Sequence, residues 1–397
     1  MTRDLKIFLV ATEESGDRLG GALMQALRER AGDDVQFIGV GAHAMAAQGL
    51  HSLFPIHELA IMGFSAIPRR VPAILRRIRE TANAVLSARP DALIIIDSPD
   101  FTHRVARRVR AADPSIPIVN YVPPAVWAWR PWRAKTMRRY VDHALALLPF
   151  EPAVHRKLGG PECSYVGHPL AHQVAALRPN AEEARRRVTD PPVVLVLPGS
   201  RGSEIRRLAG VFGEAIARLH ERAGGIELVL PTVPALRDQV AAATASWAVR
   251  PRIVVDPAEK QEAYRTARVA LTKSGTVTLE LALAGIPMAA AYKVSGFEVW
   301  VARRLVHVPS VILANLVLGQ NVVPEFIQEA CTADALAETL LPLLADTPER
   351  RRQTEAFARL DVIMEIGSRA PAGRAADIVL GTIRQHGQPF AGTAPNL

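Results

Sequence analysis

The sequence has few cysteines and no long apolar run, and both absences narrow the class of protein. Its 397 residues include two cysteines, Cys163 and Cys331. Two cysteines provide neither a disulfide framework nor the ligand spacing of a structural zinc site. The longest apolar runs, such as residues 92–96, are far shorter than the roughly 20 residues that a membrane-spanning helix needs. The N-terminal residues lead into a strand-like run at 7–10 without an apolar leader, so we expect a cytoplasmic protein.

Several motifs of nucleotide- and metal-dependent enzymes are missing as well. Gly39-Val40-Gly41 begins a G-x-G-x-x-G fingerprint, but no glycine stands at its third glycine position. The sequence has no Walker A lysine motif, no H-E-x-x-H helix and no G-x-S-x-G elbow. These absences argue against a dinucleotide-dependent dehydrogenase, a P-loop ATPase, a zinc peptidase and a serine hydrolase.

Aromatic residues are also scarce, at 5% of the chain, whereas positive charge is plentiful. The formal net charge is +9, and arginines cluster at 69–79 and 104–110. Such a balance suits nucleic acid, an anionic membrane surface or phosphorylated substrates, and a solvated basic surface is the fourth interpretation. Because the basic residues are not interleaved with stacking aromatics, we expect no nucleic-acid partner.

Short apolar runs alternate with longer amphipathic segments, which is typical of parallel strands joined by helices. The sequence therefore predicts an α/β fold with two doubly wound Rossmann-like domains facing a cleft. The first domain spans 1–170 and the second 171–365, with a hinge within 167–190, and 366–397 form a terminal helix and tail that pack back on the first domain. The expected strands lie near 5–11, 35–40, 92–97, 116–121 and 144–148, and again at 193–197, 226–230, 252–255, 269–272 and 288–292.

In the first half, polar loops follow two of the predicted strands, where open α/β sheets place ligands. The loop at 12–17 carries carboxylates, a serine and a glycine that suit polar contacts to a sugar, although Ser15 or Asp17 would also suit a helix cap. Asp97 follows the apolar run 92–96. A carboxylate there has its pKa raised by desolvation, which suits a general base. For Asp100 we favour a helix cap, and a metal site on this loose D-x-x-D pattern is the weaker alternative.

In the second half, two glycine-containing loops stand between a strand and a helix. In the first, Gly199, Ser200 and Arg201 offer backbone amides and a guanidinium to a diphosphate. The second, residues 272–276, offers hydroxyl and N–H groups, and Glu280 one turn later can accept the two ribose hydroxyls. A capping arrangement of Ser or Thr with the downstream Glu explains the second loop equally well.

Taken together and in order, these segments resemble the lipid A disaccharide synthase family of glycosyltransferases, which has the two-domain GT-B fold. The resemblance covers almost the whole chain. Its most distinctive part is the run Tyr121-Val122-Pro123-Pro124-Ala125-Val126-Trp127-Ala128-Trp129-Arg130. The other matching stretches are 11–17, 96–102, 148–151, 166–169, 197–201, 273–280, Asn315 and 324–328.

The resemblance implies an inverting transfer that joins UDP-2,3-diacylglucosamine to 2,3-diacylglucosamine 1-phosphate (lipid X) and yields the β-1,6-linked disaccharide 1-phosphate and UDP. It implies Asp97 as the base and Glu13 and Asn315 as further residues needed for activity. The UDP-sugar would contact Gly199, Ser200, Arg201, Ser274, Gly275, Thr276, Glu280 and Gln328. Because positive loops can replace a metal ion at the departing diphosphate, we expect no metal and no cofactor.

Acylated substrates require contact with a bilayer, and the segment 61–79 combines apolar groups with arginines. We expect Ile67, Arg70, Val71, Ile74 and Arg77 to meet the membrane and the acceptor on an interfacial helix. The protein would then be peripheral on the inner face of the inner membrane, with its anionic surface as a partner. An ordinary amphipathic helix facing the core explains the same spacing.

Two questions stay open at this point. A UDP-sugar epimerase of the same architecture would share the phosphate loops but would need neither the basic and apolar segment nor a lipid acceptor. A homodimer is also compatible with the sequence.

Overall fold

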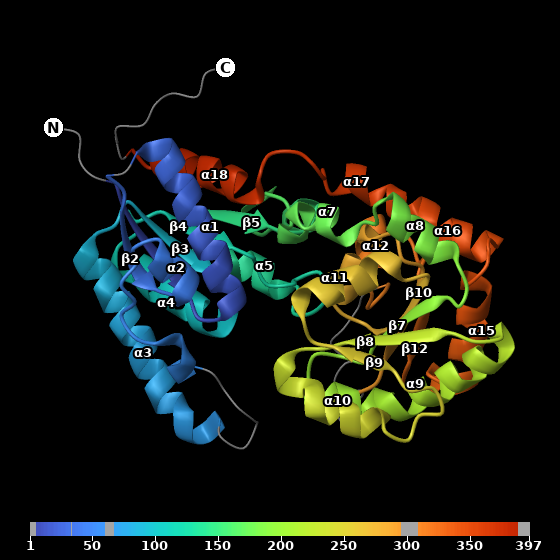
Figure 1. Ribbon diagram of the computed structural model, residues 1–397. Helices are drawn as coiled ribbons and strands as arrows, with labels where there is room; N and C mark the ends of the chain where they lie inside the picture. Colours follow the sequence, from blue (N-terminus) through green and yellow to red (C-terminus); the bar gives the residue numbers. More distant parts are fainter. Residues whose placement is uncertain (1–4, 33, 60–66, 295–308, 388–397) are drawn as a thin grey trace. The chain divides into compact units, whose positions relative to one another are not determined.

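The computed structural model describes residues 5–32, 34–59, 67–294 and 309–387, with the side chains of 67–70 outside that description. The chain divides into two compact units. Unit 1 comprises Met1–His168 together with Ser368–Leu397, and unit 2 comprises Pro169–Gly367. The C-terminal helix α18 (Pro371–Gln385) therefore belongs with the N-terminal residues, where it lies beside α1 (Glu14–Ala31) (Figure 1).

Unit 1 is built on a six-stranded parallel sheet with the order β2-β1-β3-β4-β5-β6. Its strands are β1 (Lys6–Ala11), β2 (Gln36–Val40), β3 (Ala92–Ile96), β4 (Ile118–Tyr121), β5 (His143–Ala146) and β6 (Glu162–Tyr165). Besides α1 and α18, its helices are α2 (His43–Ala47), η1 (Ile56–Leu59), α3 (Ile67–Ala88), α4 (Pro99–Ala112), α5 (Trp132–Met137) and α6 (Glu151–Lys157).

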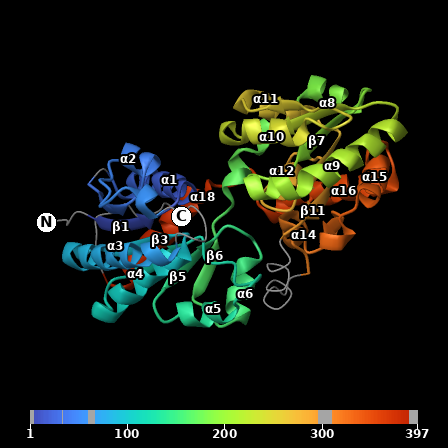
Figure 2. The same cartoon turned by 90° about the horizontal axis from the view of Figure 1, so that it is seen from below.

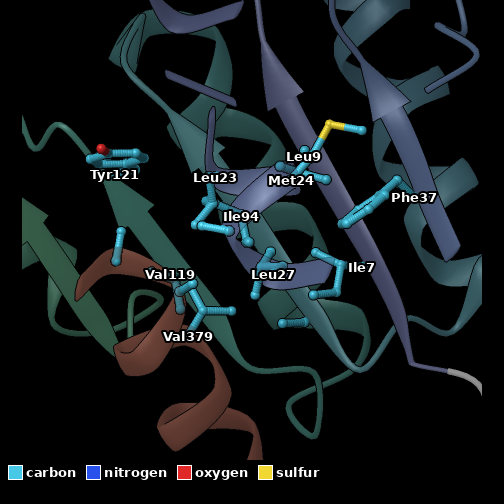
Figure 3. Close-up of a cluster of buried hydrophobic side chains, with 14 of the residues drawn as sticks. Ile7, Leu9, Leu23, Met24, Leu27, Phe37, Ile94, Val119, Tyr121 and Val379 are labelled. Atoms are coloured by element: carbon cyan, nitrogen blue, oxygen red, sulfur yellow. The ribbon is translucent and has the colours of Figure 1, made fainter. Parts of the chain in front are cut away.

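Strand β3 is apolar throughout, and β1 is apolar after Lys6, because helices cover both faces of the sheet. Along β1, Ile7 and Leu9 point into the cluster under α1 and α18, while Phe8 and Val10 point into the cluster under α3 and α4. Figure 3 shows the first cluster, in which Leu27 of α1 and Val379 of α18 pack beside side chains of the sheet. Figure 2 shows α1 and α18 on one side of this sheet and α3 and α4 on the other.

Unit 2 repeats the architecture with the strand order β12-β11-β10-β7-β8-β9, again all parallel. Its strands are β7 (Val193–Leu197), β8 (Glu227–Pro231), β9 (Arg252–Val254), β10 (Val269–Lys273), β11 (Met288–Tyr292) and β12 (Glu325–Ile327). Its helices are η3 (Pro169–His172), α7 (Val174–Leu177), α8 (Ala181–Val188), α9 (Gly202–Ala223), η4 (Pro234–Leu236), α10 (Arg237–Thr244), α11 (Pro257–Thr266), α12 (Val277–Leu283), α14 (Leu313–Leu318), η5 (Gln328–Ala330), α15 (Ala333–Leu343), α16 (Pro348–Ala358) and α17 (Leu360–Ile363).

The α/β class and the ten predicted strands are confirmed, and each sheet has one further strand that the sequence did not predict. The two additional strands, β6 and β12, lie at sheet edges. Both are short, and neither has a fully buried residue, so their sequences lack the continuous apolar run that marks a central strand.

The segment predicted to contain a hinge has regular structure along most of its length. From Pro169 onward it belongs to unit 2, where α7 packs on α11 and α12 and α8 packs on α11. Helix α8 begins with a complete capping box, in which Asn180 accepts from two backbone N–H groups and Glu183 accepts from the Asn180 N–H. The change of unit thus falls within the first residues of this segment, between His168 and Pro169.

A buried carboxylate joins two loops of unit 1. Glu151, at the start of α6, accepts from the Trp127 indole N–H at 3.2 Å and from the Leu148 backbone N–H at 3.0 Å. Burial raises the pKa of Glu151 to about 7, although these hydrogen bonds act in the opposite direction. The carboxylate therefore holds the loop after β4 against the loop after β5.

This pKa makes the stability of the protein depend on pH. A carboxyl group whose pKa is raised on folding contributes stability below its ordinary pKa and loses that contribution as pH rises through about 7. Relative to Glu151→Gln, we expect the free energy of unfolding of the natural protein to fall by roughly 2–3 kcal/mol between about pH 5 and pH 8 in urea denaturation. Glu29→Gln is the control, because it removes an exposed carboxylate. Relative to Glu29→Gln, the free energy of unfolding of the natural protein should show no such fall. Parallel pH profiles for the natural protein and Glu151→Gln would contradict the assignment.

Candidate active site

In unit 1, the polar loops of the first half meet because of the strand order. Strands β1 and β3 are neighbours, with Ala11 opposite Ile96 at their carboxyl ends, although 80 residues of chain separate them. The loop carrying Glu13 and the loop carrying Asp97 therefore leave the same edge of the sheet side by side. The Ser98 hydroxyl donates to Glu13 Oε1 at 3.0 Å and links the two loops directly.

The backbone at Asp97 has a conformation that few residues adopt. Asp97 and Ser98 have φ values of 52° and 44°, in the left-handed region, which costs roughly 1–3 kcal/mol for each residue. Two hydrogen bonds hold this turn: the Asp97 N–H donates to the Tyr121 carbonyl at 3.0 Å, and the Thr102 hydroxyl donates to the Asp97 carbonyl at 2.6 Å. The surrounding structure thus fixes the direction in which the Asp97 side chain leaves the strand.

The electrostatic surroundings of Asp97 favour a proton acceptor. Burial raises the pKa of its carboxyl group, the negative charge of Glu13 raises that pKa further, and a hydrogen bond with the Ser98 backbone partly opposes both. A carboxylate with a raised pKa is a stronger base than an aspartate with an ordinary pKa. This is the property that its position after an apolar strand predicted.

Beside Asp97 lies a pocket of about 660 Å³. Its lining combines carboxylates with apolar side chains from η1, α3 and α4. The lining residues are Thr12, Glu13, Glu14, Ile56, His57, Leu59, Ile74, Ser98, Pro99, Asp100 and Phe101. Asp97 adjoins this pocket through Ser98 and is not itself among the lining residues. Such a pocket suits a ligand with a polar ring and an apolar chain.

Two expected helix caps in these loops turn out differently. Helix α1 begins at Glu14 after Glu13, with no side-chain cap, and Asp17 instead accepts from three backbone N–H groups at the start of α2. The N-cap of α4 is Ser98, so the capping role expected of Asp100 was wrong. Asp100 is exposed and forms an ion pair with Arg133 at 3.3 Å.

Unit 2 has a second loop pair at the corresponding point of its own sheet. Strands β7 and β10 are neighbours, with Leu197 opposite Thr272, so the loops that follow them leave the sheet together. They enclose a pocket of about 370 Å³. Its lining includes six of the eight predicted UDP-sugar residues: Gly199, Ser200, Arg201, Gly275, Thr276 and Glu280. The other lining residues are Leu197, Glu204, Pro231, Thr232, Val233, Lys260, Tyr264, Lys273 and Val277.

The loop after β7 presents backbone N–H groups at the start of α9, a 22-residue helix. Gly199 has a φ of 132°, which only glycine adopts readily. The Arg201 side chain is 80% exposed, and its guanidinium lies 3.9 Å from Glu204. The N-terminal end of a helix attracts anions, and a flexible guanidinium beside it adds bidentate contacts to phosphate oxygens.

At the far side of the same pocket, Glu280 is oriented by a buried tyrosine. The Tyr264 hydroxyl donates to Glu280 Oε2 at 3.5 Å, and Tyr264 has no exposed surface. Burial and the Glu280 charge raise the pKa of Tyr264 well above its usual range, so it stays a donor. A carboxylate held in this way can accept from a pair of vicinal hydroxyls. The capping box proposed as an alternative does not form, since α12 has no side-chain cap.

Ser274 and Gln328 complete the predicted UDP-sugar set but do not line this pocket. Ser274 is buried, and its hydroxyl donates to the Val311 carbonyl at 2.6 Å. This hydrogen bond ties the loop after β10 to the segment at Val311. Gln328 exchanges two hydrogen bonds with the backbone of Val294, at 3.0 and 3.3 Å. Both side chains thus hydrogen-bond to backbone groups of other segments.

Asn315 is buried in a network of its own. Its side-chain oxygen accepts from the N–H groups of Val322 and Val323, and its amide nitrogen donates to the Val323 carbonyl and to Glu325. This arrangement fixes the course of the chain into β12. An influence on activity through loop shape fits this geometry better than direct contact with a substrate.

The helix predicted to meet the membrane has a mixed character. Val71 is 41% exposed, whereas Ile74 packs partly against the core of unit 1. Arg77 stacks over Phe54 and forms ion pairs with Glu58 and Glu80. The side chains of Ile67 and Arg70 lie outside the described residues. The face of α3 that carries Ile74 and Ile78 thus packs on the core, as the alternative interpretation had it.

Sequence reasoning assigned no role to Lys273, Glu204, Lys260 or Tyr264, although all four line the pocket of unit 2. Lys273 and Glu204 stood within the two loops, and their opposite charges were the available signal. Nothing in the sequence marks Lys260 or Tyr264 as pocket residues, because they belong to α11 and lie outside both loops. No helix within the described ranges is long and apolar enough to cross a membrane, and these ranges contain no group of three or more metal-ligating side chains.

Comparison with known proteins decides the family. The family model described as lipid-A-disaccharide synthetase matches residues 7–377. The chain belongs to this family. It is 64% identical to the lipid-A-disaccharide synthase of Rhodopseudomonas palustris strain HaA2, over 96% of this chain and 97% of that protein. It is 63% identical to the enzyme of the same name from Bradyrhizobium diazoefficiens, with the same coverage.

Membership of this family makes the chain a glycosyltransferase, as the sequence predicted. Among solved structures, a UDP co-structure of Staphylococcus aureus MnaA matches with a TM-score of 0.59 at 13% identity, covering 96% of each chain. MurG of Acinetobacter baumannii matches with a TM-score of 0.55 at 13% identity, covering 96% of this chain and 100% of that one. Such neighbours show the fold alone, that of GT-B transferases and related epimerases, and the family decides for a transferase.

The coupling between Glu13 and Asp97 is testable through the pH dependence of activity. Glu13→Gln removes a charge that raises the pKa of Asp97, so the ionised base should persist to lower pH. We expect the acid limb of the kcat/KM profile to move to lower pH, as measured by UDP release. Burial remains the larger cause, so the limb should stay above the range of an ordinary aspartate.

Glu29→Gln is the matched control, because it removes an exposed carboxylate from the last turns of the same helix, α1. An acid limb that is unmoved in Glu13→Gln, or moved equally in both variants, would rule out the coupling.

Proposed function

We propose that this enzyme transfers the sugar of UDP-2,3-diacylglucosamine to the 6-hydroxyl of 2,3-diacylglucosamine 1-phosphate. The products are the β-1,6-linked disaccharide 1-phosphate and UDP. The observation that carries the proposal is the pairing of two loop sites of opposite chemistry, an acidic and apolar one in unit 1 and an amide-rich one in unit 2, in a chain of this family.

In unit 2, the pocket at the carboxyl ends of β7 and β10 is assigned to the UDP-sugar. The N–H groups around Ser200 and the Arg201 guanidinium would bind the diphosphate, with the second loop, at 275–276, on the other side. Glu280 would accept the ribose hydroxyls. These groups would stabilise the negative charge that UDP gains as it departs, with no metal ion required.

In unit 1, the pocket beside Asp97 is assigned to the acylated acceptor. Its carboxylates Glu13 and Glu14 can accept from sugar hydroxyls, and its apolar residues Leu59 and Ile74 can contact part of an acyl chain. Asp97 would take the proton of the 6-hydroxyl. The freed oxygen would attack the anomeric carbon opposite the nucleotide, so that the carbon–oxygen bond to UDP breaks as the new bond forms and the configuration inverts.

Because the base and the nucleotide site belong to different units, the proposed transfer requires both units to engage the same reacting pair. Alignment of two bound reactants supplies a large part of the rate acceleration in such a displacement. A decisive assay incubates the purified protein with both substrates and follows UDP and the disaccharide by mass spectrometry. Formation of both, dependent on both substrates, is the expected result, and release of UDP without a disaccharide would overturn the proposal.

The role of Asp97 is tested by its isosteric amide. Asp97→Asn should reduce kcat about 10²–10⁴-fold, since it removes the proton acceptor, and should leave the Kd for UDP unchanged. Asparagine tolerates the left-handed conformation of this residue, so the fold should persist. Asp34→Asn, at an exposed aspartate of the same unit, should keep its full activity. A folded Asp97→Asn enzyme with the natural kcat would remove Asp97 from the mechanism.

We also propose a peripheral position on the inner face of the inner membrane, with contact through the first half of α3. Val71, Pro72 and Ala73 are exposed there, and Arg76 and Arg79 extend from the same helix into solvent. This combination of exposed apolar and basic side chains suits an anionic bilayer surface. The ion pairs of Arg77 make it a poorer lipid contact than the sequence had indicated.

Replacement of these two arginines tests the membrane surface. Each basic residue near an anionic surface contributes about 1 kcal/mol, so Arg76→Gln/Arg79→Gln should weaken binding to phosphatidylglycerol vesicles by about 30-fold and reduce its salt dependence. Arg222→Gln/Arg237→Gln removes the same charge from exposed positions of unit 2 and should change little. Equal losses in the two double variants would locate the contact elsewhere.

A further inference from the structure

Glu204, in the first turn of α9, folds back over the loop that precedes its own helix. Its carboxylate accepts from the Ser200 N–H at 3.0 Å and lies 3.2 Å from the Lys273 ammonium. The side chains of Glu204 and Lys273 are only 13% and 17% exposed. The carboxylate lies so close to Gly199 that a Cβ there would come within 2.4 Å of Glu204 Oε2. The glycine thus makes room for this carboxylate.

The Ser200 N–H and the Lys273 ammonium, both of which contact Glu204, are the kind of groups that bind a diphosphate. A diphosphate at the start of α9 would require the Ser200 N–H and a nearby cation, and the pocket that contains both is lined by Glu204 itself. Two anions cannot share these donors at contact distance without strong repulsion. Binding of a diphosphate therefore demands that the Glu204 carboxylate give up the amide and the ammonium.

We propose that Glu204 is an internal competitor of the diphosphate, and that Lys273 passes from Glu204 to the diphosphate as a nucleotide-binding residue. This inference rests on the proposed function, since it deepens the assignment of UDP to this pocket. The exchange would favour nucleoside diphosphates, because a ligand with little negative charge gains too little from the amide and the ammonium to displace a carboxylate.

The surroundings of Lys273 fit such an exchange. Its ammonium lies 5.3 Å from the centre of the Tyr292 ring, a contact that does not depend on Glu204. The cation therefore keeps a fixed position at the end of β10 when its carboxylate partner moves. The Arg201 side chain is far more exposed than that of Lys273, so Lys273 is the better positioned of the two cations.

The exchange predicts that the affinity for UDP increases when a neutral side chain of similar shape replaces the Glu204 carboxylate. By calorimetry, Glu204→Gln should bind UDP about tenfold more tightly, UMP with a smaller gain and uridine with none. Lys273→Met should bind UDP about tenfold more weakly, and Lys273→Arg should largely retain affinity. In the Lys273→Met background, Glu204→Gln should give a smaller gain. Glu221→Gln, an exposed carboxylate of the same helix, controls for overall charge.

A purely structural role for Glu204 predicts the opposite sign, because loss of its bond to Ser200 would loosen the loop and weaken UDP binding. Weaker or unchanged UDP binding in a folded Glu204→Gln variant, or an equal change for uridine, would overturn the inference. Glu204→Asp, which keeps the charge but shortens its reach, provides a second variant and should also bind UDP more tightly. An enzyme that forms the disaccharide but fails these tests defeats this inference alone, whereas a natural protein that binds no UDP defeats the proposed function too.

Discussion

The order of the strands is the constraint on which both sites depend. In a parallel sheet all carboxyl ends lie along one edge, and the loops that leave neighbouring strands toward opposite faces leave a crevice between them. Here the neighbours are β1 and β3 in one sheet and β7 and β10 in the other. The loop of Glu13 lies beside the loop of Asp97, and the loops of Gly199 and Gly275 line one pocket. The strand order brings these loops together, since they are far apart in the sequence. Any change of register between these strands would separate the groups that the proposed chemistry needs.

The two units have the same arrangement of neighbouring central strands, but the loops after those strands differ in charge. In unit 1 the paired loops carry carboxylates, and burial, together with the negative charge of Glu13, raises the pKa of Asp97. In unit 2 the paired loops present helix N–H groups, Arg201 and Lys273, which attract negative charge. The proposed proton acceptor and the proposed anion site thus share one architecture, and the difference between them lies in a few residues after each central strand.

The sequence predicted the central strands well because a strand buried on both faces must be apolar along its whole length, as in β1 and β3. The edge strands β6 and β12 lack such an apolar run and were not predicted. The sequence singled out Asp97 because it directly follows the apolar strand β3, and Gly199 because it stands two residues after the apolar strand β7. The hydrogen-bond partners of Ser274 and Asn315 were not predictable, since they depend on backbone that only the fold brings near. The spacing of α3 likewise could not separate a face that meets the core from one that meets solvent.

Several residues of the matching stretches touch neither pocket, and their positions show why a family pattern contains more than reacting groups. Asn315 and Glu151 each bind backbone or side-chain donors of a loop, and each is buried. A buried polar group without its partner costs roughly 1–3 kcal/mol, so such residues impose one loop conformation by making the alternatives unfavourable. Displacement of a reacting group by about 1 Å can cost 100-fold in rate. Within one stretch, some residues therefore fix the shape of a loop while others belong to the proposed chemistry. Loss of activity on mutation does not by itself distinguish these two roles.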